Sequence, residues 1–250
     1  MKLSVVVICW NSLENLRQLL ESIPGALAGI DYEVILTDNG STDGTAAFVA
    51  EKFPDVKYQR LDRNYGVAYA RNRGIERTCG EYVWLLDDDT IINCEAAQTL
   101  IGYMESHPRC GVCACALRDV DGNLQLSYKP FPGLRLKARN LFGLETDDPY
   151  KAAVDAGRPF EPVYVIGACQ LIRRGALRDA GLLDEKIFYG PEDADFCLRV
   201  REAAWSVAYL PQVSIIHKWK RITSRRPFSK IGREHIRALV YFYFKHRRFV

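Results

Sequence analysis

The chain has 250 residues, of which 48% are apolar, and its apolar runs are shorter than the ~18 residues that a membrane-spanning helix needs. This composition excludes a disordered tail, a collagen-like repeat and a low-complexity linker, and the length allows one large domain or two small ones. The formal net charge is +3, but residues 217–250 carry eleven Lys or Arg and one acid, so a tail of charge +10 follows a body of charge −7.

Strand and helix signals alternate through the first half of the chain. Apolar, β-branched runs predict strands at residues 3–9, 32–36, 56–61 and 82–86. Apolar residues at helical spacing predict helices at residues 13–23, 41–50, 66–77 and 94–104. We expect Asn11 and Ser12 to cap the first of these helices and Pro24 with Gly25 to end it. Strands that alternate with helices predict right-handed crossovers and a mainly parallel sheet flanked by helices, an α/β fold.

The second half has shorter strands and a long irregular stretch. The pattern predicts a turn at 121–123, a helix at 192–203 and strands at residues 112–117, 163–172, 207–210 and 213–216. Residues from about 130 to 162 contain several Pro and Gly, and a loop of that length in a compact domain is usually functional or mobile. Because the chain has no internal repeat and no clear linker, we interpret it as a single domain.

The eight cysteines raise the question of disulfides or zinc. The apolar N-terminal run at residues 3–8 is too short for a signal peptide and lacks a small-residue cleavage site. We therefore expect a cytoplasmic chain with reduced thiols. Cys110 and Cys113 have the spacing of half a zinc site, but no second ligand pair stands at a matching spacing.

Polar side chains follow four predicted strands at the point where each strand ends. They are Trp10 and Asn11, Asp38 and Asn39, Arg63 and Asn64, and the three aspartates at 87–89. In open α/β sheets, ligands bind outside the carboxyl ends of the strands, so a ligand site is expected at this edge. Asp and Asn also form turns and caps without any ligand, so one such strand end alone would not predict a site.

Asp87, Asp88 and Asp89 directly follow a predicted buried strand. Adjacent carboxylates repel one another unless a cation is bound. Asp87 and Asp89 alternate on extended backbone and can therefore point the same way. Carboxylate oxygens suit Mg²⁺ or Mn²⁺, which can bridge to a diphosphate. The alternative is a helix cap with solvated neighbours.

A second acidic cluster, Glu192, Asp193 and Asp195, stands at a predicted helix start, where the helix dipole favours negative charge. Capping explains one or two of these acids. A carboxylate near a bound cation and diphosphate could instead act as a general base. His217, after the last predicted strand, is either a structural histidine or a metal or phosphate ligand.

Several of these segments follow one another in a specific order. They are residues 5–11 (VVVICWN), 37–44 (TDNGSTDG), 64–74 (NYGVAYARNRG), 85–89 (LLDDD), 167–174 (GACQLIRR) and the pair Glu192 and Asp193. Over nearly the whole chain, this order resembles the family 2 glycosyltransferases of the GT-A fold, in the rhamnosyltransferase-like bacterial branch. The resemblance implies one Rossmann-like domain at 1–216, with a nucleotide-binding part at about 1–116 and an acceptor and catalytic part at about 117–216. A basic C-terminal extension follows at 217–250.

The resemblance also implies a role for each matching residue. The implied nucleotide contacts are Cys9, Trp10, Asn11, Asp38, Asn64, Gly66, Arg71 as a base contact, Asp87 and Asp88. Asp87 and Asp89 match the D-x-D motif that holds Mg²⁺ or Mn²⁺ on the donor diphosphate, and His217 matches a histidine near that metal. Asp193 matches the catalytic base, with Glu192 beside it and Asp195 as the fallback. The acceptor-binding segment is matched by Gly167, Ala168 and Cys169. The middle residue of D-x-D is usually not acidic, so Asp88 departs from the pattern.

The implied activity is an inverting sugar transfer in bacterial surface polysaccharide synthesis. The donor would be a UDP- or dTDP-sugar, dTDP-rhamnose among them, and the acceptor a hydroxyl of a glycan or lipid-linked glycan. The alternative is a nucleotide-sugar-binding protein without transferase activity, although binding alone does not require the second acidic cluster. No nucleic-acid partner is expected, because the body is net acidic and no nucleic-acid-binding fold is recognisable.

The basic tail predicts an amphipathic helix from residue 229. Its apolar residues are Ile231, Ile236, Leu239, Val240, Phe242 and Phe244, and its basic residues include Lys230, Arg233, Arg237, Lys245, Arg247 and Arg248. One interpretation is peripheral docking on an anionic surface at the inner face of the cell membrane. The other is a helix packed on the body with its charges in solvent. The two are not exclusive.

Overall fold

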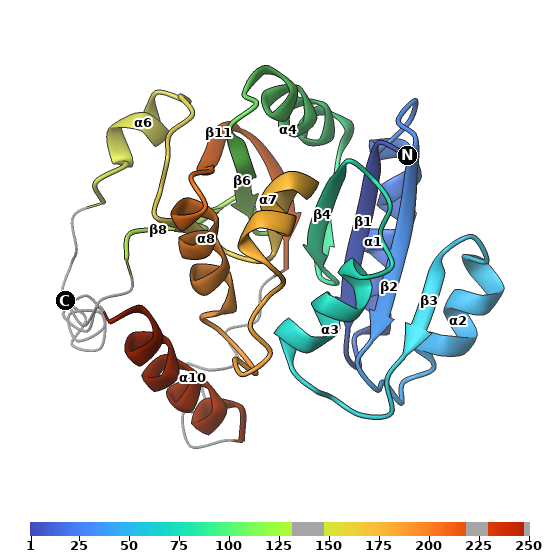
Figure 1. The fold of residues 1–250 in the computed structure, drawn as a ribbon. Helices are drawn as coiled ribbons and strands as arrows, with labels where there is room; N and C mark the ends of the chain where they lie inside the picture. Colours follow the sequence, from blue (N-terminus) through green and yellow to red (C-terminus); the bar gives the residue numbers. More distant parts are fainter. Residues whose placement is uncertain (132–147, 219–229, 248–250) are drawn as a thin grey trace.

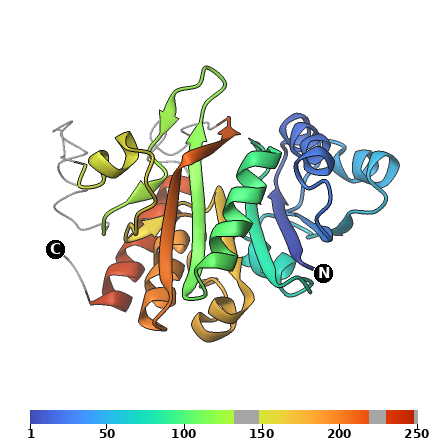
Figure 2. The ribbon, with the colours of Figure 1, turned by 90° about the horizontal axis from the view of Figure 1, so that it is seen from above.

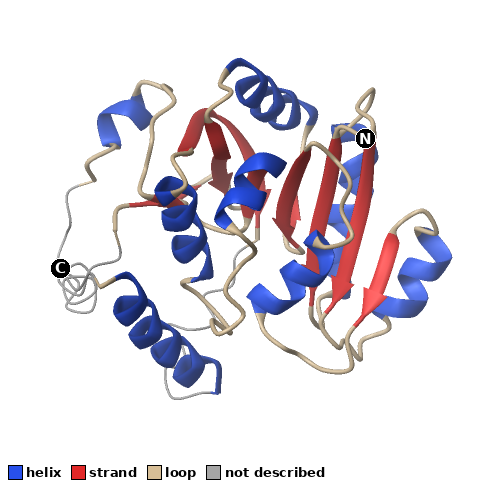
Figure 3. Ribbon diagram, in the orientation of Figure 1, coloured by secondary structure: helices blue, strands red, loops and turns tan. Residues whose placement is uncertain are grey.

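The computed structural model in Figure 1 describes residues 1–131, 148–218 and 230–247. A nine-stranded sheet lies between two layers of helices, as Figure 3 shows by colour, and a separate two-stranded sheet joins β8 to β9. The strands are β1 (Leu3–Cys9), β2 (Tyr32–Asp38), β3 (Lys57–Arg60), β4 (Tyr82–Asp87), β5 (Thr90–Ile91), β6 (Cys110–Arg118), β7 (Leu124–Gln125), β8 (Tyr128–Lys129), β9 (Tyr164–Val165), β10 (Cys169–Arg173) and β11 (Ser206–His217). The helices are α1 (Leu13–Ala26), α2 (Thr45–Lys52), α3 (Val67–Ile75), α4 (Cys94–Ser106), α6 (Lys151–Asp155), α7 (Arg174–Ala180), α8 (Glu192–Glu202) and α10 (Lys230–His246).

The large sheet is mainly parallel, as expected, with β10 reversed in its middle and the short strands β5 and β7 also antiparallel to their neighbours. Its order is β3-β2-β1-β4-β10-β6-β11-β5, with β7 paired to β6. The pairs β2–β3, β1–β2, β1–β4 and β6–β11 are parallel, whereas β10 runs antiparallel to both β4 and β6. The single strand expected at 163–172 is divided into β9 and β10 by a turn at 166–168. β9 pairs with β8 in the two-stranded sheet, whereas β10 enters the large sheet between β4 and β6.

The two faces of the sheet carry two separate cores. Side chains alternate between faces along a strand, so Leu3, Val5 and Val7 of β1 pack with buried residues of α1 and α4. Val6 faces the other way and packs in the cluster that includes α3, α7 and α8. Figure 2, seen from above, shows α4 on one side of β6 and β11. Burial of apolar surface on both faces explains why these strands are nearly continuous apolar runs.

Helix α1 continues past the point where the sequence predicts its end. Pro24 lies inside the helix, and Ile23 and Ala26 on either side of it are buried. A proline within a helix removes one backbone hydrogen bond. Here the packing of Ile23 and Ala26 against the sheet outweighs that loss, so the expectation of an end at Pro24 is wrong.

The expected side-chain cap of the first helix and the expected beginning of the second are also wrong. Ser12 precedes α1 but its side chain makes no capping hydrogen bond. The Asp43 carboxylate instead accepts the backbone N–H of Leu13 at 2.9 Å and the hydroxyl of Thr45 at 2.6 Å. One carboxylate thus serves the beginnings of two helices, and α2 begins at Thr45 instead of at residue 41.

Strand β11 is one continuous strand where two were expected, at 207–210 and 213–216. Its pairing with β6 is irregular between Leu210 and Ser214, which explains the break in the apolar pattern around Pro211. Its last residue, His217, pairs with Thr90 of β5. This pairing determines where the histidine lies relative to the aspartates that precede β5.

Helix α10 lies beside α8 in Figure 1, so the tail packs at least partly on the body. Phe242 is fully buried in a small cluster with Ala194 and Leu198 of α8. Part of the predicted irregular region (132–147), the segment 219–229 and Arg248 lie outside the described residues. Within the described ranges, no helix is both long and apolar enough to cross a bilayer.

Candidate active site

Two predicted aspartates and the predicted histidine converge at one edge of the sheet. Asp87 ends β4, Asp89 lies in the turn before β5, and His217 ends β11. One ligand atom from each of the three lies within 4.8 Å of the others, and His217 Nε2 is 3.2 Å from Asp89 Oδ1. The β5–β11 pairing of Thr90 with His217 brings the groups together from residues far apart in sequence.

This donor set fits a hard divalent cation. Two carboxylates and one imidazole suit Mn²⁺ or Mg²⁺ better than soft metals, which prefer thiolates. Gln125 Oε1 is 2.7 Å from His217 Nδ1 and orients the ring with Nε2 toward the aspartates. Burial alone would lower the pKa of His217, but the hydrogen bond and charge of Asp89, together with Asp87, raise it. Gln125 follows an ordinary turn, so no sequence signal pointed to it.

Asp88 lies in the turn between β4 and β5 and is not one of the three residues whose ligand atoms come together. Burial and the neighbouring charges of Asp89 and Asp87 raise the pKa of Asp88 well above its usual range. Its role as a nucleotide contact stays a prediction, as does that of Trp10, which is 46% exposed.

The second acidic pair begins α8. Glu192 is buried, whereas Asp193 is only half-buried and accepts the backbone N–H of Ala194 at 2.7 Å. Burial and the charge of Asp193 raise the pKa of Glu192 to about 7, while Arg71 opposes the shift. Burial also raises the pKa of Asp193. Asp193 is therefore the more accessible base of the two, and a raised pKa increases its basicity.

Arg71 lies between the two acidic groups. Its guanidinium donates to Asp87 Oδ1 at 2.5 Å and to the Gly167 carbonyl at 2.8 Å, and lies 3.6 Å from Glu192 Oε1. The residue is 2% exposed. This enclosure among acidic groups does not fit the expected contact with a nucleotide base.

Asp195 is enclosed by other protein groups, so this geometry gives no support to its expected role as fallback base. The residue is fully buried, and its carboxylate contacts Arg199 at 2.9 Å, Lys245 at 2.6 Å and His246 at 2.8 Å. Asp195 and Asp193 are two positions apart on a helix, so their side chains point in different directions. Asp195 instead connects α8 to α10.

Three further predicted residues direct their side chains into the core. Cys9 is 2% exposed and packs within the apolar core, so any nucleotide contact would have to use its backbone. Ala168 and Cys169 are also buried. The Cys169 sulfur accepts from the Trp84 indole at 3.4 Å and lies 3.7 Å from the Cys115 sulfur. The buried side chains of Ala168 and Cys169 give no support to the expected acceptor contacts, although the Ala168 carbonyl accepts the backbone N–H of Asp87 at 3.4 Å.

The predicted nucleotide loop is organised by an asparagine that the predicted site omitted. Asn39 donates to Asn64 Oδ1 at 3.1 Å and accepts the backbone N–H of Tyr65 at 2.9 Å. Gly66 has φ +92°, and a Cβ there would lie 2.4 Å from the Phe188 carbonyl oxygen. Glycine is therefore required where α3 begins against the segment that leads to α8.

The side chains of Asp38 and Asn11 accept hydrogen bonds from other groups of the protein. Asp38 is fully buried, and its oxygens accept the Ser41 backbone N–H at 2.7 Å and the Tyr58 hydroxyl at 2.6 Å. Asn11 Oδ1 accepts the Thr42 backbone N–H at 2.8 Å. Both side chains shape the loops at the strand ends, and their nucleotide contacts stay predictions.

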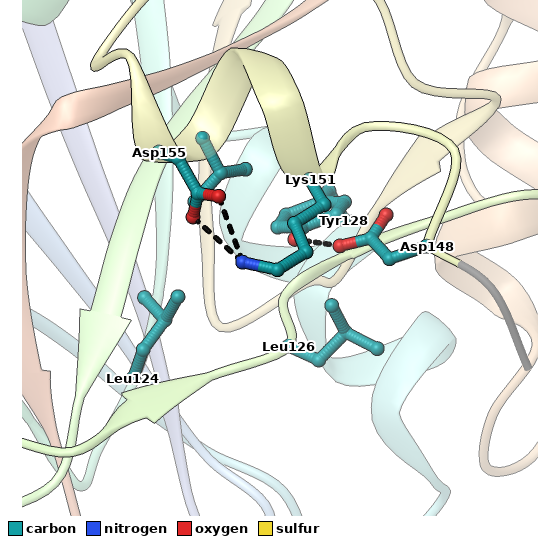
Figure 4. Close-up of a pocket in the computed structure, with 7 residues that line it drawn as sticks. Leu124, Leu126, Tyr128, Asp148, Lys151 and Asp155 are labelled. Carbon is teal, nitrogen blue, oxygen red and sulfur yellow. Dashed lines mark hydrogen bonds and ion pairs between the residues drawn. The ribbon is translucent and has the colours of Figure 1, made fainter. Parts of the chain in front are cut away.

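Figure 4 shows a pocket of about 260 Å³ beside β7 and α6. Leu124, Leu126 and Lys151 are among its lining residues, and Lys151 pairs there with Asp155 at 2.7 Å. None of the predicted site residues lines this pocket. Gln125, between the two leucines, instead contacts His217.

Comparisons with known proteins identify the family of this chain. The model of the family described as glycosyl transferase family 2 matches residues 4–181. An N-acetylglucosaminyl-diphospho-decaprenol L-rhamnosyltransferase of Mycobacterium tuberculosis is 28% identical over 98% of this chain and 85% of that protein. A poly-beta-1,6-N-acetyl-D-glucosamine synthase of Staphylococcus epidermidis is 27% identical over 84% of this chain, which spans only 48% of the synthase.

Solved structures show the same fold. A mannosyltransferase from Pyrobaculum calidifontis in complex with GDP-Man and Mn²⁺ has a TM-score of 0.67 at 18% identity, over 98% of this chain and 64% of that chain. S. aureus TarS in complex with UDP-GlcNAc has a TM-score of 0.63 at 20% identity, over 90% of this chain and 61% of the other. The expected GT-A fold is thereby confirmed. Since the family model matches well over half of the residues, the chain belongs to glycosyl transferase family 2.

Proposed function

We propose that this glycosyltransferase transfers a sugar from a nucleotide-diphosphate donor to an acceptor hydroxyl, with inversion at the anomeric carbon and dependence on Mg²⁺ or Mn²⁺. The observation that carries the proposal is the juxtaposition of two groups at one sheet edge. The first is the cluster of Asp87, Asp89 and His217, and the second is the pair of Glu192 and Asp193 across Arg71. Binding of a nucleotide sugar without transfer needs only the first group.

Asp87, Asp89 and His217 would hold the metal ion. When bound, such an ion neutralises charge on the departing nucleoside diphosphate. Gln125 keeps the His217 ring in the orientation that a ligand requires.

Asp193 would remove the proton from the acceptor hydroxyl as that oxygen attacks the sugar. Asp193 is half-buried as a residue at the beginning of α8, whereas Glu192 beside it is buried. A single in-line displacement inverts the reacting carbon and needs no covalent intermediate on the enzyme. Gly167, next to these groups, contributes its backbone carbonyl, which accepts a hydrogen bond from Arg71 at 2.8 Å.

The donor that we propose is a UDP- or dTDP-sugar, with dTDP-rhamnose tested first, and the acceptor is a glycan or lipid-linked glycan of bacterial surface polysaccharide synthesis. Support comes from the rhamnosyltransferase relative, whose name specifies a diphospho-decaprenol-linked N-acetylglucosamine. Nucleotide sugars should be screened by thermal shift with and without Mn²⁺, followed by transfer assays to N-acetylglucosaminyl-diphospho-lipid. Donor binding without transfer to any glycan acceptor would favour the binding-protein alternative.

An anionic membrane surface is the partner that we propose for α10. Its outward side presents Ile236, Val240 and Phe244, which are 55%, 51% and 69% exposed and four residues apart. Arg233 and Arg237 are exposed on the same side of the helix. An apolar stripe with a cationic rim is typical of interfacial helices, and a lipid-linked acceptor would make such docking useful.

Replacing both Arg233 and Arg237 with Gln should weaken binding to anionic liposomes. Each cation near an anionic surface contributes about 1 kcal/mol, so the pair should lower the partition coefficient by roughly tenfold or more. Cosedimentation at increasing salt measures this. Lys245 is unsuited to the test, because it pairs internally with Asp184 and Asp195.

A matched control removes two exposed cations elsewhere, at Lys52 and Arg178. The control should bind liposomes like the wild type. Equal binding of the wild type to neutral and anionic liposomes would contradict the proposal and leave α10 with a purely structural role.

A further inference from the structure

Arg71 connects parts of the chain that carry different steps of the proposed reaction. It comes from α3, on the side of the fold that holds the predicted nucleotide loop. Its guanidinium reaches Asp87 at the end of β4, the Gly167 carbonyl in the turn before β10, and Glu192 at the first position of α8. One side chain therefore spans the interval between the metal cluster and the beginning of the base-bearing helix.

The surroundings of the guanidinium are tightly fitted. A Cβ at Gly167 would lie 2.1 Å from Arg71 Nη1, so the turn can approach this closely only because residue 167 is glycine. Arg71 Nε and Nη1 and Glu192 Oε2 are buried and have no hydrogen-bond partner within the described part of the chain. The Arg71–Glu192 contact is thus held by charge at 3.6 Å and by packing, and a small displacement of either group would change it.

We propose that Arg71 is a positioning residue that sets the separation of the metal-binding carboxylate Asp87 from the Glu192–Asp193 start of α8. The role differs from contact with the nucleotide base, because the guanidinium is already enclosed by protein groups. A lysine at this position keeps the charge, but its single ammonium group lacks the planar, multiply donating guanidinium that contacts three partners at once. The inference rests on the proposed transferase activity, since turnover is its main readout.

The first test compares Arg71→Met with Arg71→Lys. Misplacement of reacting groups by about 1 Å lowers turnover by roughly 10²-fold, so kcat should fall by about that factor in Arg71→Met and by less in Arg71→Lys. Affinity for the free nucleoside diphosphate in EDTA, measured by calorimetry, should stay within a factor of two or so of the wild type. The control is Arg73→Met, which removes a cation of the same helix that forms ion pairs with Glu76 and Glu185.

The second test leaves Arg71 in place. Gly167→Ala should displace the guanidinium and reproduce the kcat loss, and it should add little to Arg71→Met in the double variant, because both changes break the same connection. Gly102→Ala is the matched control, since a Cβ there meets nothing within 4 Å. If Arg71→Met does not fold, Gly167→Ala and Arg71→Lys decide the question.

Two outcomes would overturn the inference. One is a loss of nucleotide affinity with kcat retained, which is the behaviour of a base contact. The other is additive effects of Arg71→Met and Glu192→Gln on the free energy of unfolding. This comparison of unfolding free energies needs no enzymatic activity. A chain without transferase activity would therefore refute the proposed function, while the coupling between Arg71 and Glu192 could still be measured.

Discussion

Asp193→Asn should lower kcat by ~10²–10⁴-fold, the range in which a general base contributes to turnover. The amide keeps the size of the carboxylate and much of its hydrogen bonding, including acceptance from Ala194, but cannot take a proton. Donor affinity should therefore change little. Initial rates at saturating donor, with a separate binding measurement, separate the two effects.

The pH profile adds a second check on Asp193. A base acts only when deprotonated, and burial raises the pKa of Asp193 above that of an ordinary aspartate. In the wild type, kcat should therefore fall as the pH drops through a midpoint above the usual aspartate range. The residual kcat of Asp193→Asn should not show this fall at low pH.

Asp195→Asn is the matched control for Asp193→Asn. It changes a carboxylate two positions away that contacts Arg199, Lys245 and His246. Removing one member of a buried ion pair destabilises a protein by about 3–5 kcal/mol, so the expected effect is a lower melting temperature. At temperatures where the variant is folded, kcat should be near that of the wild type. Normal turnover in Asp193→Asn with none in folded Asp195→Asn would contradict our choice of base.

Asp89→Ala should abolish most of the transfer activity, and so should chelation of divalent cations. Metal stabilisation of the leaving charge is worth several kcal/mol, so a loss on the order of 10³-fold is expected. Asp89 follows β4 and is only partly buried, which is why the fold should tolerate the change. Mn²⁺ binding by electron paramagnetic resonance should weaken in parallel.

The control for Asp89→Ala is Asp121→Ala, which removes an exposed acid from a turn outside the cluster. It should keep both Mn²⁺ binding and activity. Full activity of the wild type in excess EDTA, or of Asp89→Ala in any buffer, would contradict the metal assignment.

The sequence predicted the order of strands and helices well, because burial on both faces leaves a strong apolar signal in β1, β2, β4 and β6. The convergence of Asp87, Asp89 and His217 also follows the prediction, since strand ends collect at one sheet edge. The reversal of β10 was not predictable from local pattern. The direction of β10 depends on its pairing with β4 and β6, which lie far from it in sequence.

Individual side-chain roles were harder to predict. Asp195 and Asp193 look alike in sequence. Only the packing of α10 shows that the Asp195 carboxylate contacts Lys245 and His246. Arg71 matches a nucleotide-binding segment, yet its partner Gly167 is separated from it by 96 residues. Contacts over such distances depend on the assembled tertiary structure, on which local propensity gives no information.

The position of β10 has a consequence for how the chain folds during synthesis. Residues 169–173 pair with β4 on one side and β6 on the other, so both of those strands have an open edge until about two thirds of the chain has been made. Unpaired strand edges invite pairing with other chains. A fragment ending near residue 116 would keep that open edge permanently, and it should aggregate instead of forming a stable nucleotide-binding unit. Folding of residues 1–116 therefore has to wait for β10, which is made later, so the parts of the chain before and after residue 116 form a single cooperative unit.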